Sequence, residues 1–121
     1  MPSPGFVPDL GDFVRIVLDP RTGREQSGER PVLVLSPRAF NAVTGYAFVA
    51  PITGTVRGWP FEVALPPGGH VTGAVLVDQT RSIDFKVRQA RFIAKGPPGL
   101  VEAVQARLAD ILLPLFDGST G

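Results

Sequence analysis

Short apolar segments separated by glycine and proline recur along most of the chain. About six such segments are present, at residues 12–19, 31–36, 46–52, 61–65, 73–79 and 87–94. Segments of this length, bounded by Gly and Pro, are typical of β-strands. The first two carry apolar residues on both faces, so we expect them to be partly buried on both sides. The chain between the segments lacks the helices that parallel βαβ units require, which favours an antiparallel sheet.

The hydrophobic pattern changes its period near the C-terminus. Four apolar residues recur there at intervals of four, four and three, the spacing of one helix face: Leu100, Val104, Leu108 and Ile111. This spacing predicts one long helix from about 99 to 113, which follows Pro98 and ends before Pro114. Strands followed by a terminal helix predict a mainly β fold, a small antiparallel β-barrel with a C-terminal α-helix.

Composition limits the number of domains and the kind of partner. With 121 residues the chain has the size of one domain, which we expect to span 1–121. Charged residues make up 19% of the chain, against about 25% in typical domains. This favours a homo-oligomer, because one small core hides only part of the apolar surface. The formal net charge of +1 gives no overall basic field, so any nucleic-acid site must be local.

Several classes of chemistry lack the residues that they need. The chain has no cysteine, which excludes disulfides and thiolate metal sites, and a single histidine, His70, does not make a histidine-based zinc site. We therefore expect no metal and no cofactor, and we assign His70 no role. No apolar stretch reaches the about 18 residues of a membrane-spanning helix, and the first residues do not resemble a signal peptide. We expect a cytoplasmic protein without a membrane partner.

Polar residues that a plain β-barrel does not need gather in three segments. The first, the loop 19–30, holds six charged residues: Asp19, Arg21, Arg24, Glu25, Glu29 and Arg30. A solvated loop with charge pairs would explain most of them. Arg30 differs because it precedes Pro31 at the start of an apolar strand. A guanidinium there needs an anionic partner, either a carboxylate such as that of Glu25 or a phosphate.

The second segment, PITGT at 51–55, ends a predicted strand with threonines. A threonine hydroxyl at a strand end either bonds to a turn amide or donates to a phosphoryl oxygen. Trp59 follows shortly after and is either a stacking platform or a core or interface aromatic.

The third segment, 78–95, has a local excess of positive charge. After Asp78 it contains five basic residues and one acid, Asp84. Within it Gln79 can read a base edge and Arg81 can bind a phosphate. Charges on the outer face of a barrel would serve solubility alone, so both interpretations stay open.

Taken together, five sequence blocks in this order closely resemble the MazF/PemK family of toxin endoribonucleases. The blocks are GD-x₆-DP (11–20), G-x-EQ-x-G-x-RP-x-x-VLSP (23–37), P-x-T (51–53), G-x-PFEV (58–63) and DQ-x-x-SID (78–84). The resemblance covers about residues 8–113. It implies an SH3-like β-barrel of the CcdB/PemK type, acting as a homodimer. It also implies metal-independent cleavage of single-stranded RNA at short motifs, with a MazE-like antitoxin that silences the toxin.

The resemblance also implies roles for particular residues. The catalytic arginine of the family falls on Arg30, its catalytic threonine on Thr53 and its loop glutamate on Glu25. Residues expected to bind RNA lie in the loop and in the late segment: Asp19, Gln26, Asp78, Gln79 and Arg81. Glu29 matches no position of the pattern, so we expect it to face solvent.

Two other functions remain open at this point. A noncatalytic SH3-like binding module would use the loop charges only as surface salt bridges. A toxin of the same fold directed at DNA gyrase, as in the CcdB branch, would lack the EQ-x-G-x-RP loop. The loop between PFEV and DQ, residues 64–77, differs among relatives with different targets, so the RNA motif does not carry over.

Overall fold

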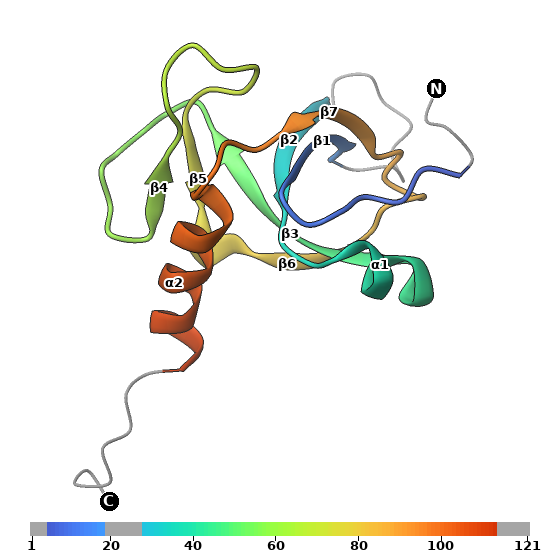
Figure 1. Cartoon of the computed structure of the whole chain (residues 1–121). Coiled ribbons are helices and arrows are strands. Elements are labelled where there is room, and N and C mark those ends of the chain that lie inside the picture. Colours follow the sequence, from blue (N-terminus) through green and yellow to red (C-terminus); the bar gives the residue numbers. More distant parts are fainter. Residues whose placement is uncertain (1–4, 19–27, 114–121) are drawn as a thin grey trace, which may run out of the picture.

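The computed structural model describes residues 5–18 and 28–113, which form a strongly curved antiparallel sheet with three helical segments (Figure 1). The strands are β1 (Asp12–Val17), β2 (Glu29–Val34), β3 (Tyr46–Thr53), β4 (Glu62–Ala64), β5 (Ala74–Leu76), β6 (Arg81–Asp84) and β7 (Arg91–Lys95). The helical segments are α1 (Arg38–Thr44), the short 3-10 turn η2 (Val77–Gln79) and α2 (Leu100–Leu112). The predicted fold class, mainly β with a C-terminal helix, is confirmed.

The long strand β3 organises the sheet. The strand order is β4-β5-β3-β2-β1-β7, and β6 also pairs with β3. The first half of β3 pairs with β6 and its end pairs with β5, while β2 occupies its other edge. Among the described strands β4 and β7 are the two ends, so the predicted barrel is an incompletely closed, curled sheet. The C-terminal end of β3 therefore lies between β2 and β5.

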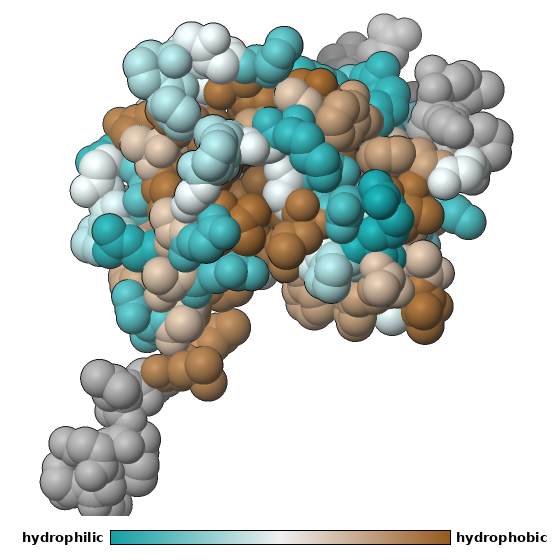
Figure 2. All heavy atoms as spheres, in the orientation of Figure 1, coloured by the Kyte–Doolittle hydropathy of each residue, from teal (hydrophilic) through white to brown (hydrophobic). Residues whose placement is uncertain are grey.

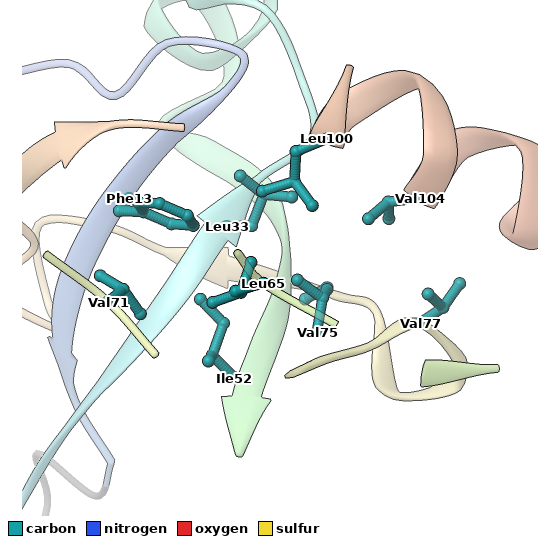
Figure 3. Close-up of a cluster of buried hydrophobic side chains, with 10 residues drawn as sticks. Phe13, Leu33, Ile52, Leu65, Val71, Val75, Val77, Leu100 and Val104 are labelled. Atoms are coloured by element: carbon teal, nitrogen blue, oxygen red, sulfur yellow. The ribbon is translucent and has the colours of Figure 1, made fainter. Parts of the chain in front are cut away.

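Two hydrophobic clusters pack on opposite faces of the central strands. One contains Phe13 of β1 and Leu33 of β2 together with the start of α2, and Figure 3 shows its buried side chains. The other contains the neighbouring residues Val14 and Val32. Successive side chains of a strand point to opposite faces, so β1 and β2 contribute to both clusters. The two-sided burial predicted for 12–19 and 31–36 is confirmed for the described residues 12–18 and 31–36.

Helix α2 begins and ends within one residue of the predicted 99 and 113. Leu100 and Val104 are buried against the sheet, as the spacing predicted. Leu112 is 65% exposed and Leu113 is 74% exposed, which shows that the end of the helix no longer packs against the sheet. Figure 2 shows this end of α2 as a hydrophobic surface. The end of α2 is thus apolar surface that the described residues, 5–18 and 28–113, leave exposed.

Helix α1 was not predicted, because its supports come from distant residues. The Asp9 carboxylate accepts the N–H of Arg38, the first residue of the helix, at 2.9 Å. Buried Asn41 donates to the Pro8 carbonyl at 2.8 Å. The Arg38 N–H lowers the pKa of the Asp9 carboxyl, partial burial opposes this, and the Leu10 N–H and nearby cations lower it further. No local periodicity reveals such a helix.

The last three strands also differ in detail from the prediction. The segment 73–79 divides into β5 and η2, and the unpredicted β6 follows it. The first half of 87–94 is a turn in which Gln89 has φ 53°. Two bonds from Arg88 fix this turn: its guanidinium donates to the carbonyls of Val17 and Leu18. The strand begins only at Arg91.

Candidate active site

Arg30 is placed by the register of the central strands. It is the second residue of β2 and lies opposite Ile16 of β1. Val32 lies opposite Pro51 of β3 in the antiparallel pair β2–β3. Continuing this register by two residues brings Arg30 opposite Thr53, on the same face of the sheet. Two of the three residues predicted to be catalytic, Arg30 and Thr53, are therefore brought together although 23 positions of sequence, 30 to 53, separate them.

Arg30 and Thr53 line one groove of about 500 Å³. Arg15 of β1 lines it as well, and the loop before β5 adds His70 and Thr72. Arg30 and Thr53 are half-buried, so each is held by the sheet and still reaches solvent. The two arginines make this groove suited to an anion such as a phosphate.

The acidic residue that lines the groove, Glu29, is paired with an arginine of another strand. Glu29 is exposed, as predicted, and its carboxylate forms a hydrogen-bonded ion pair with Arg91 of β7. Among the residues that the structure describes, Arg30 has no salt bridge. Its guanidinium is thus available to a ligand, as far as residues 5–18 and 28–113 are concerned.

Thr53 satisfies a turn amide and faces the groove at the same time. Its Oγ1 accepts the N–H of Thr55 at 3.1 Å, while its own hydroxyl has only a 3.5 Å contact to the Thr55 carbonyl. The oxygen is therefore fixed, and the hydroxyl hydrogen can turn to a ligand. Close packing fixes the backbone too: a Cβ on Gly73 would lie 1.9 Å from the Thr53 carbonyl oxygen. Only glycine permits β5 to approach this closely.

The predicted RNA-binding residues of the late segment border the same surface. Asp78 and Gln79 belong to η2 and are exposed. Together with Thr53 they line a pocket of about 270 Å³. A further pocket of about 350 Å³ contains Arg30, Gln79 and Arg81. Hence Arg30, Thr53, Asp78, Gln79 and Arg81, which come from three parts of the sequence, share one continuous surface. Predicted Glu25, Asp19 and Gln26 lie outside the described residues.

The basic segment 78–95 separates into two groups. Arg81 lies at the site and Arg91 pairs with Glu29 at the rim of the groove, whereas Arg88 and Lys95 bind acceptors elsewhere. Lys95, for example, lies 2.6 Å from the carboxylate of buried Asp12. Most of the basic side chains in this segment are therefore bound to acceptors within the protein, and only some of them are available to a ligand at the site.

Sequence reasoning missed Arg15, Thr72 and the position of His70. The sequence did show Arg15 as a charge between apolar residues of a strand, but its neighbours across the sheet were not readable. The loop of His70 ends at Gly73, which packs on Thr53, so the fold brings this loop to the groove.

Within 5–18 and 28–113, no group of three or more His, Cys, Asp or Glu side chains is placed to hold a metal ion. In the same ranges, no helix has the length and apolar character needed to cross a membrane.

Comparison with known proteins defines the class to which this fold and groove belong. Residues 9–112 match the family model of PemK-like, MazF-like toxins of type II toxin-antitoxin systems. The endoribonuclease toxin MazF of Escherichia coli K12 is 38% identical over 103 residues, which cover 85% of this chain and 92% of that protein. The endoribonuclease PemK of Escherichia coli is 40% identical over 108 residues, covering 86% and 81%.

Solved structures give the same result. MazF of Deinococcus radiodurans is 43% identical with a TM-score of 0.79, covering 88% of this chain and 97% of that chain. A MazE–MazF complex from the same organism contains a chain that is 41% identical, also with a TM-score of 0.79. The chain belongs to the PemK-like, MazF-like toxin family. The predicted family and the predicted enzyme class, endoribonuclease, are thereby confirmed.

Proposed function

We propose that this protein is a single-domain toxin that cuts single-stranded RNA at the groove between β2 and β3, without a metal ion. The observation that carries the proposal is that Arg30 and Thr53, both half-buried, line one groove together with Arg15. Family membership supplies the enzyme class, and the groove supplies the chemistry of a phosphate site.

The substrate itself provides the nucleophile. The RNA 2′-OH attacks the adjacent phosphorus, the bond to the 5′-oxygen breaks, and the products are a 2′,3′-cyclic phosphate and a 5′-OH end. DNA lacks the 2′-OH and is not a substrate. The guanidinium of Arg30 donates two hydrogen bonds to the phosphate oxygens as negative charge develops on them. The hydroxyl of Thr53 donates a third.

Two protons must move in this reaction. Arginine has a reference pKa of about 12.5 or above, which makes it a poor general base near neutrality. A carboxylate such as that of Glu25 suits this step better, either as the base or as the group that orients Arg30. Arg30 then acts as the acid toward the departing 5′-oxygen.

RNA recognition is assigned to the surface beside the groove. Asp78 and Gln79 read base edges and Arg81 binds a phosphate. Asp19 and Gln26, which lie outside the described residues, are assigned to RNA binding from the family resemblance alone. Only an unpaired strand can splay its bases toward such side chains, which makes single-stranded RNA the substrate.

A protein partner controls the activity in this proposal. The similar MazF of Deinococcus radiodurans has been solved with MazE, so we assign to this chain a MazE-like antitoxin that blocks the groove. The chain forms a homodimer in this proposal. Exposed apolar residues such as Leu112 and Leu113 favour it, because association would remove them from water. The toxin acts in the cytoplasm, where it cuts mRNA and stops translation and growth.

The experiment uses the purified protein with a randomised RNA pool in the presence of EDTA. We expect cuts at one short recurring motif, with 2′,3′-cyclic phosphate and 5′-OH ends. A single 2′-deoxy substitution at the cut must abolish cleavage. Arg30→Lys must lower the rate, whereas the matched control Arg107→Lys, on the exposed side of α2, must not. Intact RNA, or full activity of Arg30→Lys, would contradict the proposal.

A further inference from the structure

Trp59 is the chain's single tryptophan and lies in the loop between β3 and β4. Its side chain is 54% exposed. It lines the pocket of about 270 Å³ that Thr53, Asp78 and Gln79 also line. The sequence left open whether this residue belongs to the core, to an interface or to a binding site. The structure excludes the core.

The backbone that carries Trp59 is held in place by Glu62, the first residue of β4. One oxygen of the Glu62 carboxylate accepts the N–H groups of Arg57 and Gly58, both at 2.9 Å. The N–H of Glu62 in turn donates to the Trp59 carbonyl at 3.0 Å. Three hydrogen bonds thus fix the loop although its side chains remain exposed.

The same loop is tied to the turn that carries Asp78 and Gln79. The N–H of Val77 donates to the carbonyl of Phe61 at 3.0 Å. Glu62 also pairs with Leu76 of β5, the residue directly before η2. The backbone segments that carry the indole and the two polar side chains are therefore joined by hydrogen bonds, which keeps the two walls of the pocket next to each other.

The guanidinium of Arg57, in the same loop, contacts the ring of Trp59. Its Cζ lies 5.5 Å from the centroid of the Trp59 ring, the distance of a cation–π contact. The guanidinium lies over one face of the exposed indole, so a flat ligand would stack on the other face, and the cation can also bind an anion. A nucleotide offers both partners, because it joins a flat base to a phosphate.

We propose that this pocket is a subsite for one unstacked nucleobase next to the scissile phosphate. In it the base stacks on Trp59, and Asp78 and Gln79 bind its edge. The inference rests on the proposed function and names a specificity contact of the same site. Thr53 lines both the groove of Arg30 and this pocket, which places the base adjacent to the cut.

Two features narrow the ligand. The pocket volume of about 270 Å³ lies below the roughly 300–1,000 Å³ of sites for drug-sized ligands, which suits a single base. The carboxylate of Asp78 accepts hydrogen bonds, so it favours a base with an exocyclic amino group, as on cytosine or adenine. Uracil has a carbonyl oxygen where cytosine has its exocyclic amino group, so it cannot donate a hydrogen bond to Asp78 there and is disfavoured.

Because Trp59 is the single tryptophan, its fluorescence reports on this pocket directly. The probe is an RNA oligonucleotide that contains the mapped cleavage motif with a 2′-deoxy sugar at the cut. We expect this probe to quench the fluorescence, and an abasic residue at one position beside the cut to prevent quenching. Binding of the probe is followed independently by the anisotropy of a label on the oligonucleotide.

Kinetics separate this subsite from the chemistry. Trp59→Ala is expected to raise KM by about ten- to a hundred-fold, in line with the loss of one stacked base, and to leave kcat unchanged. Trp59→Phe should retain most of the binding. Discrimination against uracil at the stacked position should fall in Trp59→Ala, because the base is no longer held against Asp78. It should persist in Trp59→Phe. Phe92→Ala is the control, because Phe92 is an equally exposed aromatic, 52%, on β7.

Glu62 is a positioning residue for this subsite. Glu62→Ala removes the acceptor that holds the loop and should reproduce part of the KM increase, together with weaker quenching. Glu62→Gln keeps one carbonyl oxygen and should restore most of both. An equal loss in Glu62→Gln and Glu62→Ala would contradict this role.

The outcomes separate the subsite from the proposed function. If the RNA is cut in an Arg30-dependent way but the bound probe leaves Trp59 fluorescence unchanged, the subsite is wrong and the enzyme stands. If fluorescence changes with protein concentration and not with RNA, Trp59 lies between two copies of the chain, and the subsite is again wrong. If no RNA is cut, the proposed function itself is overturned.

Discussion

The two halves of the candidate site are held by different means. Arg30 and Thr53 stand on neighbouring strands, and the register of β2 and β3 sets the distance between them. Trp59 and Asp78 stand on a loop and a short turn, which hydrogen bonds from Glu62 and Val77 fix. The strand-held half is part of the packed sheet, so it tolerates little change. The loop-held half can vary without disturbing the core.

This difference suits two tasks. Transition-state stabilisation requires donors in one fixed geometry, which a sheet supplies. Base recognition is the part of the proposed activity that a change of target motif would alter, and a loop held by a few polar contacts can change its residues at low cost to stability. Changes in the strand-held half should therefore lower kcat, and changes in the loop-held half should raise KM.

The largest effect is expected from Arg30→Lys. Lysine keeps the charge but loses the fork that donates two hydrogen bonds, so kcat should fall by about 100- to 1,000-fold while the free energy of unfolding stays nearly constant. Single-turnover cleavage at saturating RNA measures the first quantity and urea unfolding the second. A change in KM alone would assign Arg30 to binding and remove the distinction between the halves.

Gly73→Ala should damage the strand-held half through packing. The new Cβ would lie 1.9 Å from the Thr53 carbonyl, and Gly73 has φ 113°. We expect a loss of about 2–4 kcal/mol in the free energy of unfolding, and a lower kcat in the protein that remains folded. Gly5→Ala is the matched control, since nothing lies within 4 Å of its Cβ position. Equal urea midpoints for the two variants would show that β5 does not approach Thr53 so closely.

Gly58→Ala should weaken the loop-held half alone. Gly58 has φ 75°, which strains alanine, but its Cβ position is open. The strain of about 1 kcal/mol opposes the loop conformation that Glu62 holds, so KM should rise a few-fold and kcat should not change. Steady-state kinetics on the mapped RNA motif give both values. A lower kcat with unchanged KM would contradict the division of roles.

The smallest effect is expected outside both halves, at Asp9. Its carboxyl pKa is lowered in the folded protein, chiefly by the Arg38 N–H. A lowered folded pKa means that the stabilisation is fully present above the unfolded value of about 3.9 and is lost as pH falls through the folded value. Asp9→Asn should therefore cost about 1 kcal/mol at pH 7 and almost nothing near pH 2. Urea unfolding at both pH values tests this, and cleavage should not change.

Much of the fold was predictable, because local signals encode it, whereas in the strand-held half only Arg30 had a local signal and Thr53 was assigned through the family resemblance. The spacing of Leu100 and Val104 located α2, and the position of Arg30 before Pro31 indicated a need for an anion. Helix α1 was not predictable, since Asp9 and Pro8 support it from about 30 positions away. The same holds for Arg15, which reaches the groove only through the pairing of β1 with β2.

The loop-held half was only partly predictable. The DQ-x-x-SID block pointed to Asp78 and Gln79, but nothing in the sequence joined them to Trp59. That connection depends on the pairing of β4 with β5, three residues each, which no periodic pattern reveals in so short a strand. Which loops meet is a property of topology, and for this reason the pocket became visible only in the folded chain.

The central claim is that Arg30 and Thr53 act on one phosphate, and a double-mutant cycle tests it most directly. The rate of the chemical step is measured for the wild type, Arg30→Lys, Thr53→Val and the double variant on the same RNA. We expect Thr53→Val to cost about ten-fold in the wild type and much less in the Arg30→Lys background, because the two donors share one transition state. Independent losses, which multiply in the double variant, would contradict the claim.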